Sequence, residues 1–389
     1  MYLSAKYVFR VNLPPLENGL LELDNDGTIL NISQYNKIEH QNIDVQFFDG
    51  VLVPGFINTH CHLELSHMRD HIPEQTGLME FVTHVGKLNK ELTNKEIAIK
   101  EADQEMYRNG IVAVGDISNN IITKDIKKQS KIFYHTFVEL IDLNPKEWKY
   151  KIINGLLIQE QFETQSSIVP HASYSVSEKL LEQITKIAKH NNNVVSIHNQ
   201  ETEEENKFFW DKTGEIAKLY EKIGEDISHF QPSQKTSLQT ILPSLPKDTN
   251  LLLIHNIHSS ETDIKLAEEY SKNIFWCMCP KSNIYIENKL PNINLFVKNN
   301  CKITIGTDSL ASNHKFDFLS EMKTLQNNFE NLSFNQILEW ATLNGAKSLK
   351  IDQNFGSIEI GKKPGINLIK NFDLSEMKLT EDSYLKKII

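Results

Sequence analysis

The sequence of 389 residues contains little cysteine, no excess of basic residues and no long apolar run. Its four cysteines are too few for a disulfide framework, which fits the reducing cytoplasm, where we expect the protein. Its 51 acidic and 41 basic residues give a formal net charge of −10 at pH 7, so we expect no nucleic-acid partner. No stretch approaches the roughly 18 apolar residues of a membrane-spanning helix, so we expect no membrane partner either.

Eight short apolar runs alternate with stretches of helical periodicity in the middle of the chain. These runs cover residues 51–54, 111–115, 133–138, 167–170, 194–197, 251–254, 274–278 and 302–306. Continuous apolar runs of this length are typical of parallel strands that are buried on both faces. Eight such strands with intervening helices predict an α/β fold of the (β/α)8 TIM barrel type. A doubly wound open sheet is the alternative, but no glycine-rich G-x-G-x-x-G turn follows the first run.

Both ends of the chain have the character of short strands and turns. Residues 2–11 are extended and apolar, and residues 356–369 combine apolar and turn-forming positions. We therefore expect a small sheet domain built from residues 1–53 and 351–389, with a barrel formed by residues 54–350.

Histidine and aspartate residues follow five of the eight runs. They are His60 and His62 after the first run, then His171, His198, His255 and Asp308 after the fourth, fifth, sixth and eighth. Barrel enzymes carry their functional residues at these carboxyl ends, and residues two apart on an extended segment point to the same side. We infer a metal set of His60, His62, His198 and Asp308. Three imidazoles and one carboxylate suit one divalent ion, with zinc expected first and iron or manganese as alternatives.

Three residues are candidates for proton transfer at this metal. Glu201 lies one turn after His198 and is placed to carry a proton between a metal-activated water and the substrate. His255 is suited to polarise the water or the substrate, and Asp308 to combine weak metal ligation with proton acceptance. The sequence leaves the division of these roles between His255 and Asp308 open.

Six motifs carry a resemblance to a known family. They are residues 54–62 (PGFINTHCH), residues 170–175 (PHASYS), His198 with Glu201 and Thr202, and residues 253–255 (LIH), 279–283 (CPKSN) and 306–309 (GTDS). Together they resemble the amidohydrolase superfamily, in its branch of cytosine, guanine and adenosyl-type deaminases and triazine chlorohydrolases. The resemblance covers nearly the whole chain and implies a barrel with a small β-sandwich domain made from both ends. It also implies the same four metal ligands, proton transfer by Glu201 and His255, and substrate contact by His171.

The fourth run offers no lysine that could be carboxylated to bridge two metals, which favours the branch with a single metal. The resemblance then implies hydrolytic loss of ammonia from an aminated heterocycle, a purine-like or nucleoside-like small molecule. Two alternatives stay open, namely another C–N or C–Cl hydrolase on the same scaffold and a scaffold without catalytic activity. A homo-oligomer is also expected.

Two further residues are candidate substrate contacts. Glu64 completes an H-x-H-L-E pattern that is similar to the one in aminofutalosine deaminases, and the alternative is a salt bridge between Glu64 and Arg69. Asn283 follows the seventh run, where either substrate contact or helix capping is expected. The acidic residues 203–205 are expected to form the solvated first turn of a helix, which the helix dipole favours.

Overall fold

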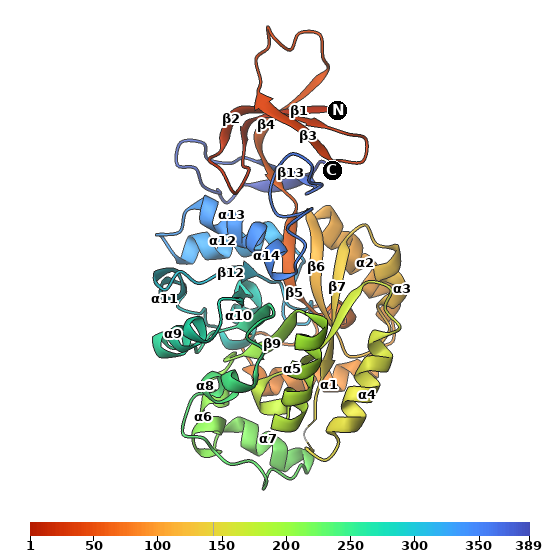
Figure 1. Ribbon diagram of the computed structural model, residues 1–389, viewed down its shortest axis with the longest axis vertical. Helices are drawn as coiled ribbons and strands as arrows, with labels where there is room; N and C mark the ends of the chain where they lie inside the picture. Colours follow the sequence, from red (N-terminus) through yellow and green to blue (C-terminus); the bar gives the residue numbers. More distant parts are fainter. Residues whose placement is uncertain (143) are drawn as a thin grey trace.

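Eight parallel strands form a closed barrel in the computed structural model, which describes residues 1–142 and 144–389 (Figure 1). The strands are β5 (Phe56–Cys61), β6 (Ile111–Ser118), β7 (Phe133–Leu140), β8 (Gln165–Pro170), β9 (Val195–Asn199), β10 (Leu251–His255), β11 (Ile274–Met278) and β12 (Ile303–Ile305). Hydrogen bonds order them as β5-β6-β7-β8 and β9-β10-β11-β12. Parallel bridges from Ala172 to His198 and from Cys61 to Asp308 join these two sheets at both edges. The predicted barrel is therefore confirmed.

The first barrel strand differs from the predicted one. Residues 51–54 belong to β4 (Val45–Pro54), which pairs in the small sheet at the top of Figure 1, and the barrel begins with β5 at Phe56. Gly55 stands between the two strands, and a Cβ atom there would lie 2.3 Å from a methyl carbon of Val112. Because glycine has no side chain at this crowded position, one continuous apolar stretch passes from the small sheet into the barrel. His60 consequently lies inside a barrel strand and not after it.

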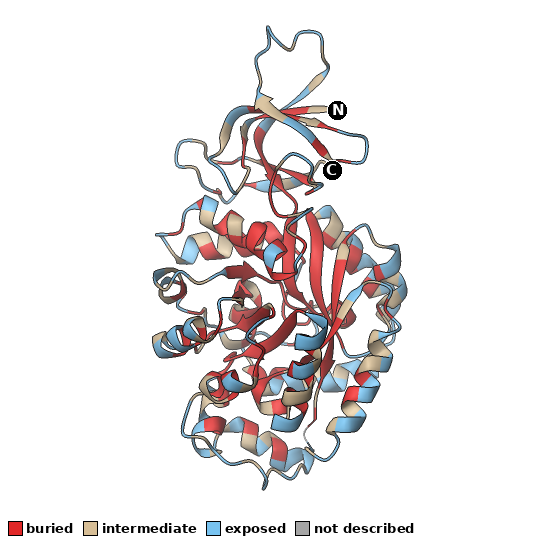
Figure 2. Cartoon of the chain, viewed as in Figure 1, coloured by how far each residue is buried: buried red, intermediate tan, exposed pale blue. Residues whose placement is uncertain are grey.

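Helices surround the barrel and turn their polar faces outward, as the exposed surfaces in Figure 2 show. They are α1 (Leu78–Glu91), α2 (Lys95–Arg108), α3 (Lys124–Gln129), α4 (Trp148–Gln159), α5 (Glu178–Asn191), α6 (Glu203–Asp211), α7 (Glu215–Ile223), α8 (Ser237–Ile241), α9 (Glu261–Tyr270), α10 (Pro280–Glu287), α11 (Ile293–Lys298), α12 (Phe318–Asn328), α13 (Phe334–Ala341) and α14 (Leu343–Ser348). Ser177 caps α5 by accepting a hydrogen bond from the Leu180 amide at 3.1 Å. Within the described parts of the chain, no helix has the length and apolar character needed to cross a membrane.

Three short 3-10 turns follow barrel strands or helices: η1 (Leu63–Met68), η2 (Ser173–Ser175) and η3 (Leu242–Ser244). The first two stand directly after β5 and β8, at the carboxyl ends where barrel enzymes place their functional groups. The first turn begins directly after His62 and the second begins two residues after His171, so each turn follows a candidate histidine.

The two ends of the chain meet in one small sheet. Its hydrogen-bonded order is β14-β13-β4-β1-β2-β3, in which the remaining strands are β1 (Tyr2–Val8), β2 (Leu16–Leu23), β3 (Ile29–Gln34), β13 (Ile366–Lys370) and β14 (Tyr384–Lys387). Strand β13 runs antiparallel to β4, with Leu368 opposite Leu52. These two leucines pack with Leu3 and Leu21 in the sheet's own buried core. The sheet is thus completed by the C-terminal strands and leads directly into the barrel through β4.

Candidate active site

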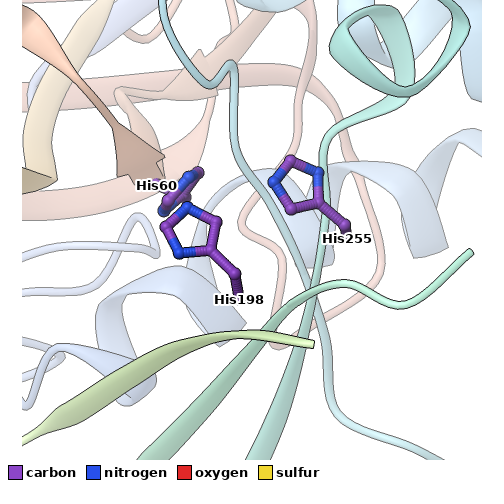
Figure 3. Close-up of side chains that lie close together, drawn as sticks. All are labelled: His60, His198 and His255. Atoms are coloured by element: carbon purple, nitrogen blue, oxygen red, sulfur yellow. The ribbon is translucent and has the colours of Figure 1, made fainter. Parts of the chain in front are cut away.

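The predicted metal ligands converge at one end of the barrel. The Nε2 atoms of His62 and His198 lie 3.3 Å apart. The Asp308 Oδ1 atom lies 3.5 Å from His60 Nε2 and 3.6 Å from His62 Nε2. Figure 3 shows the His60 and His198 rings next to each other and nearly perpendicular, with an interplanar angle of 86°, beside His255; the three residues come from strands β5, β9 and β10. The structure therefore brings these residues together as the barrel topology requires.

The chemistry of this donor set fits a divalent cation. Bonds of about 2.0–2.1 Å to a tetrahedral metal separate neighbouring donor atoms by roughly 3.3–3.4 Å, close to the spacing of the three donor pairs. His60 is completely buried, and both of its ring nitrogens lack a hydrogen-bond partner in the described part of the chain. Buried polar atoms are normally paired, so unpaired nitrogens beside a carboxylate indicate a place for an ion.

Neighbouring groups orient these side chains. The His198 Nδ1 atom lies 2.8 Å from the His171 carbonyl oxygen, so Nδ1 donates its proton there and Nε2 faces the cluster unprotonated. Ser282 and Ser312 donate hydroxyl hydrogen bonds of 2.7 and 2.6 Å to Asp308 Oδ2. The other oxygen of Asp308 is thereby directed at the histidines. These contacts fix the orientation of His198 and Asp308.

Glu201 and His255 form a pair beside this cluster. The Glu201 Oε1 atom lies 3.5 Å from His255 Nε2. Burial and then the negative charge of Asp308 raise the pKa of Glu201 well above its usual range. Burial lowers the pKa of His255 to about 4, so its imidazole is neutral at pH 7. Glu201, whose raised pKa favours the protonated form, thus faces the neutral imidazole of His255.

Asn283 holds His255 in this orientation. It lies within α10, and its Oδ1 atom lies 2.8 Å from His255 Nδ1. The His255 Nδ1 atom therefore carries the proton, and Nε2 is left as an acceptor toward Glu201. The Nδ2 atom of Asn283 is buried and has no partner among residues 1–142 and 144–389. Asn283 is not a helix cap, because Cys279 occupies that position of α10.

The two other candidate substrate contacts also lie at this end of the barrel. The Glu64 carboxylate accepts hydrogen bonds from the Asn119 amide at 3.2 Å and from Asn120 Nδ2 at 2.9 Å. Burial raises the pKa of Glu64 to about 8. The salt bridge between Glu64 and Arg69 does not form, because Arg69 pairs with the carboxylate of Glu105 at 2.7 Å. His171 is half-buried, and its Nδ1 atom lies 2.6 Å from Ser175 Oγ.

Two buried glutamates were missed by the sequence reasoning. Glu139 lies near the end of β7, where its Oε1 atom is 3.5 Å from His198 Nδ1, and its position one residue past an apolar run was the available signal. Glu205 was expected to be solvated with its neighbours, but it is fully buried while Glu203 is exposed. The expectation is wrong because the carboxylate of Glu205 turns inward to backbone amides that only the fold places there.

Comparisons with known proteins agree with this architecture. The amidohydrolase family pattern matches residues 51–386, which is most of the chain. The chain therefore belongs to the amidohydrolase family, whose fold is a barrel of this type. It is 27% identical to an adenosine deaminase of Helicobacter pylori over 380 residues, which cover 94% of this chain and 90% of that protein.

Solved structures share the fold at lower sequence identity. The Helicobacter pylori aminofutalosine deaminase in complex with methylthio-coformycin matches with a TM-score of 0.83, covering 97% of this chain and 93% of the other at 23% identity. A zinc-bound adenosine deaminase from Xanthomonas campestris matches with a TM-score of 0.76, covering 98% and 86% at 20% identity. Nearly the whole chain, including the small sheet, is therefore arranged as in these enzymes.

Proposed function

We propose that this protein is a metal-dependent deaminase that hydrolyses the amino group of a purine-like or nucleoside-like molecule and releases ammonia. The observation that carries the proposal is the convergence of His62, His198 and Asp308 on His60, whose ring nitrogens have no partner among the described residues, with the raised pKa of Glu201 beside them. The names of its relatives, adenosine deaminase and aminofutalosine deaminase, support an aminated purine nucleoside as the class of substrate. Small-molecule substrates of this kind fit a barrel mouth.

We assign one divalent ion to His60, His62, His198 and Asp308. Zinc suits three imidazoles and a carboxylate, and a zinc-bound enzyme of the same fold supports this choice over iron or manganese. When bound, the ion would supply a water molecule whose pKa is lowered toward about 7. The chain itself supplies the orientation of the four donors and the groups that move protons.

Glu201 is the proposed proton carrier. It takes a proton from the attacking water and gives it to the ring nitrogen beside the reacting carbon, whose bond to the amino group then breaks. The high pKa of Glu201 favours holding this proton between the two transfers. His255 presents Nε2 toward Glu201 as a neutral acceptor, and Asp308 is a proposed ligand whose Oδ1 atom lies 3.5 Å from His60 Nε2 and 3.6 Å from His62 Nε2. The second water proton leaves with the amino group as ammonia.

Three residues are proposed substrate contacts. His171 stands at the end of β8 and is half-buried, so part of its ring is open to a ligand. Glu64 adds a buried carboxyl group on the side of β5 and β6. The unpartnered Nδ2 atom of Asn283 is a buried donor available to a substrate acceptor.

An ammonia-release screen tests the proposal. Zinc-loaded protein would be incubated with adenosine, 5′-deoxyadenosine, aminofutalosine, guanine and cytosine, and with a chlorotriazine in a parallel chloride assay. We expect ammonia from at least one purine nucleoside and no chloride. Chloride release without ammonia, or ring opening that leaves the amino group in place, would point to the other hydrolases of this scaffold. Protein that binds no transition metal and releases neither product would favour a scaffold without activity.

A further inference from the structure

We infer that Glu205 is a positioning residue whose carboxylate fixes the backbone that carries Glu201 and ties it to the segment that follows His171. The inference rests on the proposed role of Glu201 in proton transfer. Glu205 touches neither the donor cluster nor the reacting atoms, and it acts only through the main chain. It lies in the first turn of α6 and is completely buried.

The carboxylate of Glu205 accepts three hydrogen bonds. Its Oε1 atom accepts the backbone N–H of Glu201 at 2.8 Å. Its Oε2 atom accepts the backbone N–H of Gln200 at 3.1 Å and the hydroxyl of Ser173 at 3.0 Å. Both oxygens therefore accept hydrogen bonds, and the donors lie in the segments that follow β9 and β8.

This arrangement departs from ordinary helix capping. Thr202 is the N-cap of α6 and Glu205 stands three residues later, which is the spacing of a capping box. In that motif the glutamate accepts the backbone N–H of the N-cap residue. Here the carboxylate reaches past Thr202 to the two residues before it. Its contacts therefore hold the turn that leads out of β9 in addition to starting the helix.

That turn needs to be held. Gln200 has a φ of +47°, in the left-handed region that residues with a side chain rarely adopt. The Gln200 side chain is also fixed, because Ser259 donates its hydroxyl to Gln200 Oε1 at 2.6 Å. The strained turn points Glu201 at the barrel mouth, 3.5 Å from His255 Nε2. If the turn relaxed, Glu201 would lose its position relative to His255.

The same carboxylate reaches the segment of His171. Ser173, which donates to Glu205, begins the η2 turn, and Ser175 at the end of that turn contacts His171 Nδ1 at 2.6 Å. One buried side chain therefore links the proposed proton carrier to a proposed substrate contact. Glutamine cannot replace Glu205, because the three hydrogen-bond donors need two acceptor oxygens and the glutamine amide has only one.

The test compares Glu205→Gln with Glu203→Gln in zinc-loaded enzyme. Glu203 receives the same substitution in the same helical turn, but it is exposed. We expect Glu205→Gln to lower kcat about 10- to 100-fold, which is the usual effect of losing a hydrogen bond to a charged group, with KM changed less than about threefold. Bound zinc should be unchanged, and Glu203→Gln should match wild type.

A second readout does not depend on activity. Amide hydrogen exchange of the peptide covering residues 199–203 should speed up at least about tenfold in Glu205→Gln and stay unchanged in Glu203→Gln. Wild-type exchange with wild-type kcat in Glu205→Gln would overturn the inference, and so would loss of zinc in that variant. If wild-type enzyme released no ammonia from any substrate, the proposed function would fail, while the exchange data would still decide whether Glu205 holds the turn.

A milder variant covers the case in which Glu205→Gln does not fold. Ser173→Ala removes one of the three donors and leaves the Glu201 amide bond in place. We expect a loss in kcat of about 2- to 10-fold without loss of zinc, a smaller effect than in Glu205→Gln because the carboxylate keeps both backbone donors. A Ser173→Ala enzyme with wild-type kcat, alongside an unfolded Glu205→Gln protein, would show that Glu205 serves stability alone.

Discussion

Two clusters of buried charge in the barrel differ in how they are neutralised. The mouth cluster consists of His60, His62, His198 and Asp308. The wall pair consists of Asp116 on β6 and Lys127 on α3, whose Oδ2 and Nζ atoms lie 2.6 Å apart with both side chains inaccessible to solvent. Lys127 also donates to the hydroxyls of Ser118 at 2.9 Å and Thr136 at 3.1 Å.

The comparison separates structure from function. Lys127 and Asp116 cancel each other's charge, and the second Asp116 oxygen accepts the Leu63 amide at 2.8 Å, directly after His62. The wall pair is therefore saturated by the protein itself. The mouth cluster has unpaired ring nitrogens on His60 within the described residues, which is where we propose that the divalent ion binds. Buried charge that the chain does not complete is the better indicator of a ligand site.

The strongest test of this difference removes a proposed ligand. His198→Ala should abolish zinc retention, with less than about a tenth of the wild-type metal left after dialysis, because one of four donors is gone. Metal analysis of the purified protein measures this. His190→Ala, an exposed histidine at the end of α5, is the matched control and should keep its zinc. Full zinc content in His198→Ala would show that the ligand set is wrong.

The next test changes proton transfer and leaves the proposed ligands alone. Glu201→Gln should lower kcat about 10²- to 10⁴-fold, the usual contribution of a positioned acid–base group. Its zinc content should equal that of wild type, since Glu201 is no ligand in the proposed set. Ammonia release and metal analysis on the same preparation check both parts. Wild-type turnover in this variant would remove Glu201 from the mechanism.

Breaking the wall pair should lower the stability of the folded protein. Lys127→Met leaves Asp116 buried without its partner and should lower the free energy of unfolding by about 3–5 kcal/mol. Urea unfolding of the zinc-loaded protein measures this, with Lys128→Met as the exposed neighbouring control. Folded Lys127→Met should still bind zinc. If folded Lys127→Met retained less zinc than wild type, the wall pair would contribute to metal binding at the mouth cluster.

A lone buried carboxylate sharpens the comparison further. Glu321 is fully buried and accepts from the Lys281 amide and from Asn313 Nδ2, and burial raises its pKa to about 8. Because this pKa is higher in the folded state than the ordinary 4.5, its contribution to stability is greatest below about pH 4.5 and is lost as the pH rises toward 8.

Glu321→Gln should therefore flatten the pH dependence of stability. Relative to wild type, the variant should gain on the order of 3 kcal/mol between pH 5 and pH 8, measured by urea unfolding at both pH values. Glu330→Gln, an exposed glutamate, is the control and should follow wild type at both pH values. A constant difference between Glu321→Gln and wild type across this range would show that Glu321 does not titrate there.

The sequence predicted the barrel and the meeting of the mouth residues for one reason. Parallel strands bring their carboxyl ends to one edge, so His198 and Asp308 had to approach His60 once their strands were recognised. It did not separate β4 from β5, because both are apolar and periodicity does not say which sheet receives a strand. The inward turn of Glu205 was equally hidden, since charge alone favours solvent. Such outcomes depend on tertiary contacts.

The pairing of β13 with β4 has a consequence for the order in which the protein folds during synthesis. The strand that leads into His60 is synthesised early, yet its neighbour in the small sheet comes from residues 366–370. During synthesis on the ribosome, the edge of β4 that pairs with β13 therefore stays unpaired until most of the chain has been made. Asp308 is also made late, so a nascent chain carries its histidines long before it carries the acidic member of the cluster.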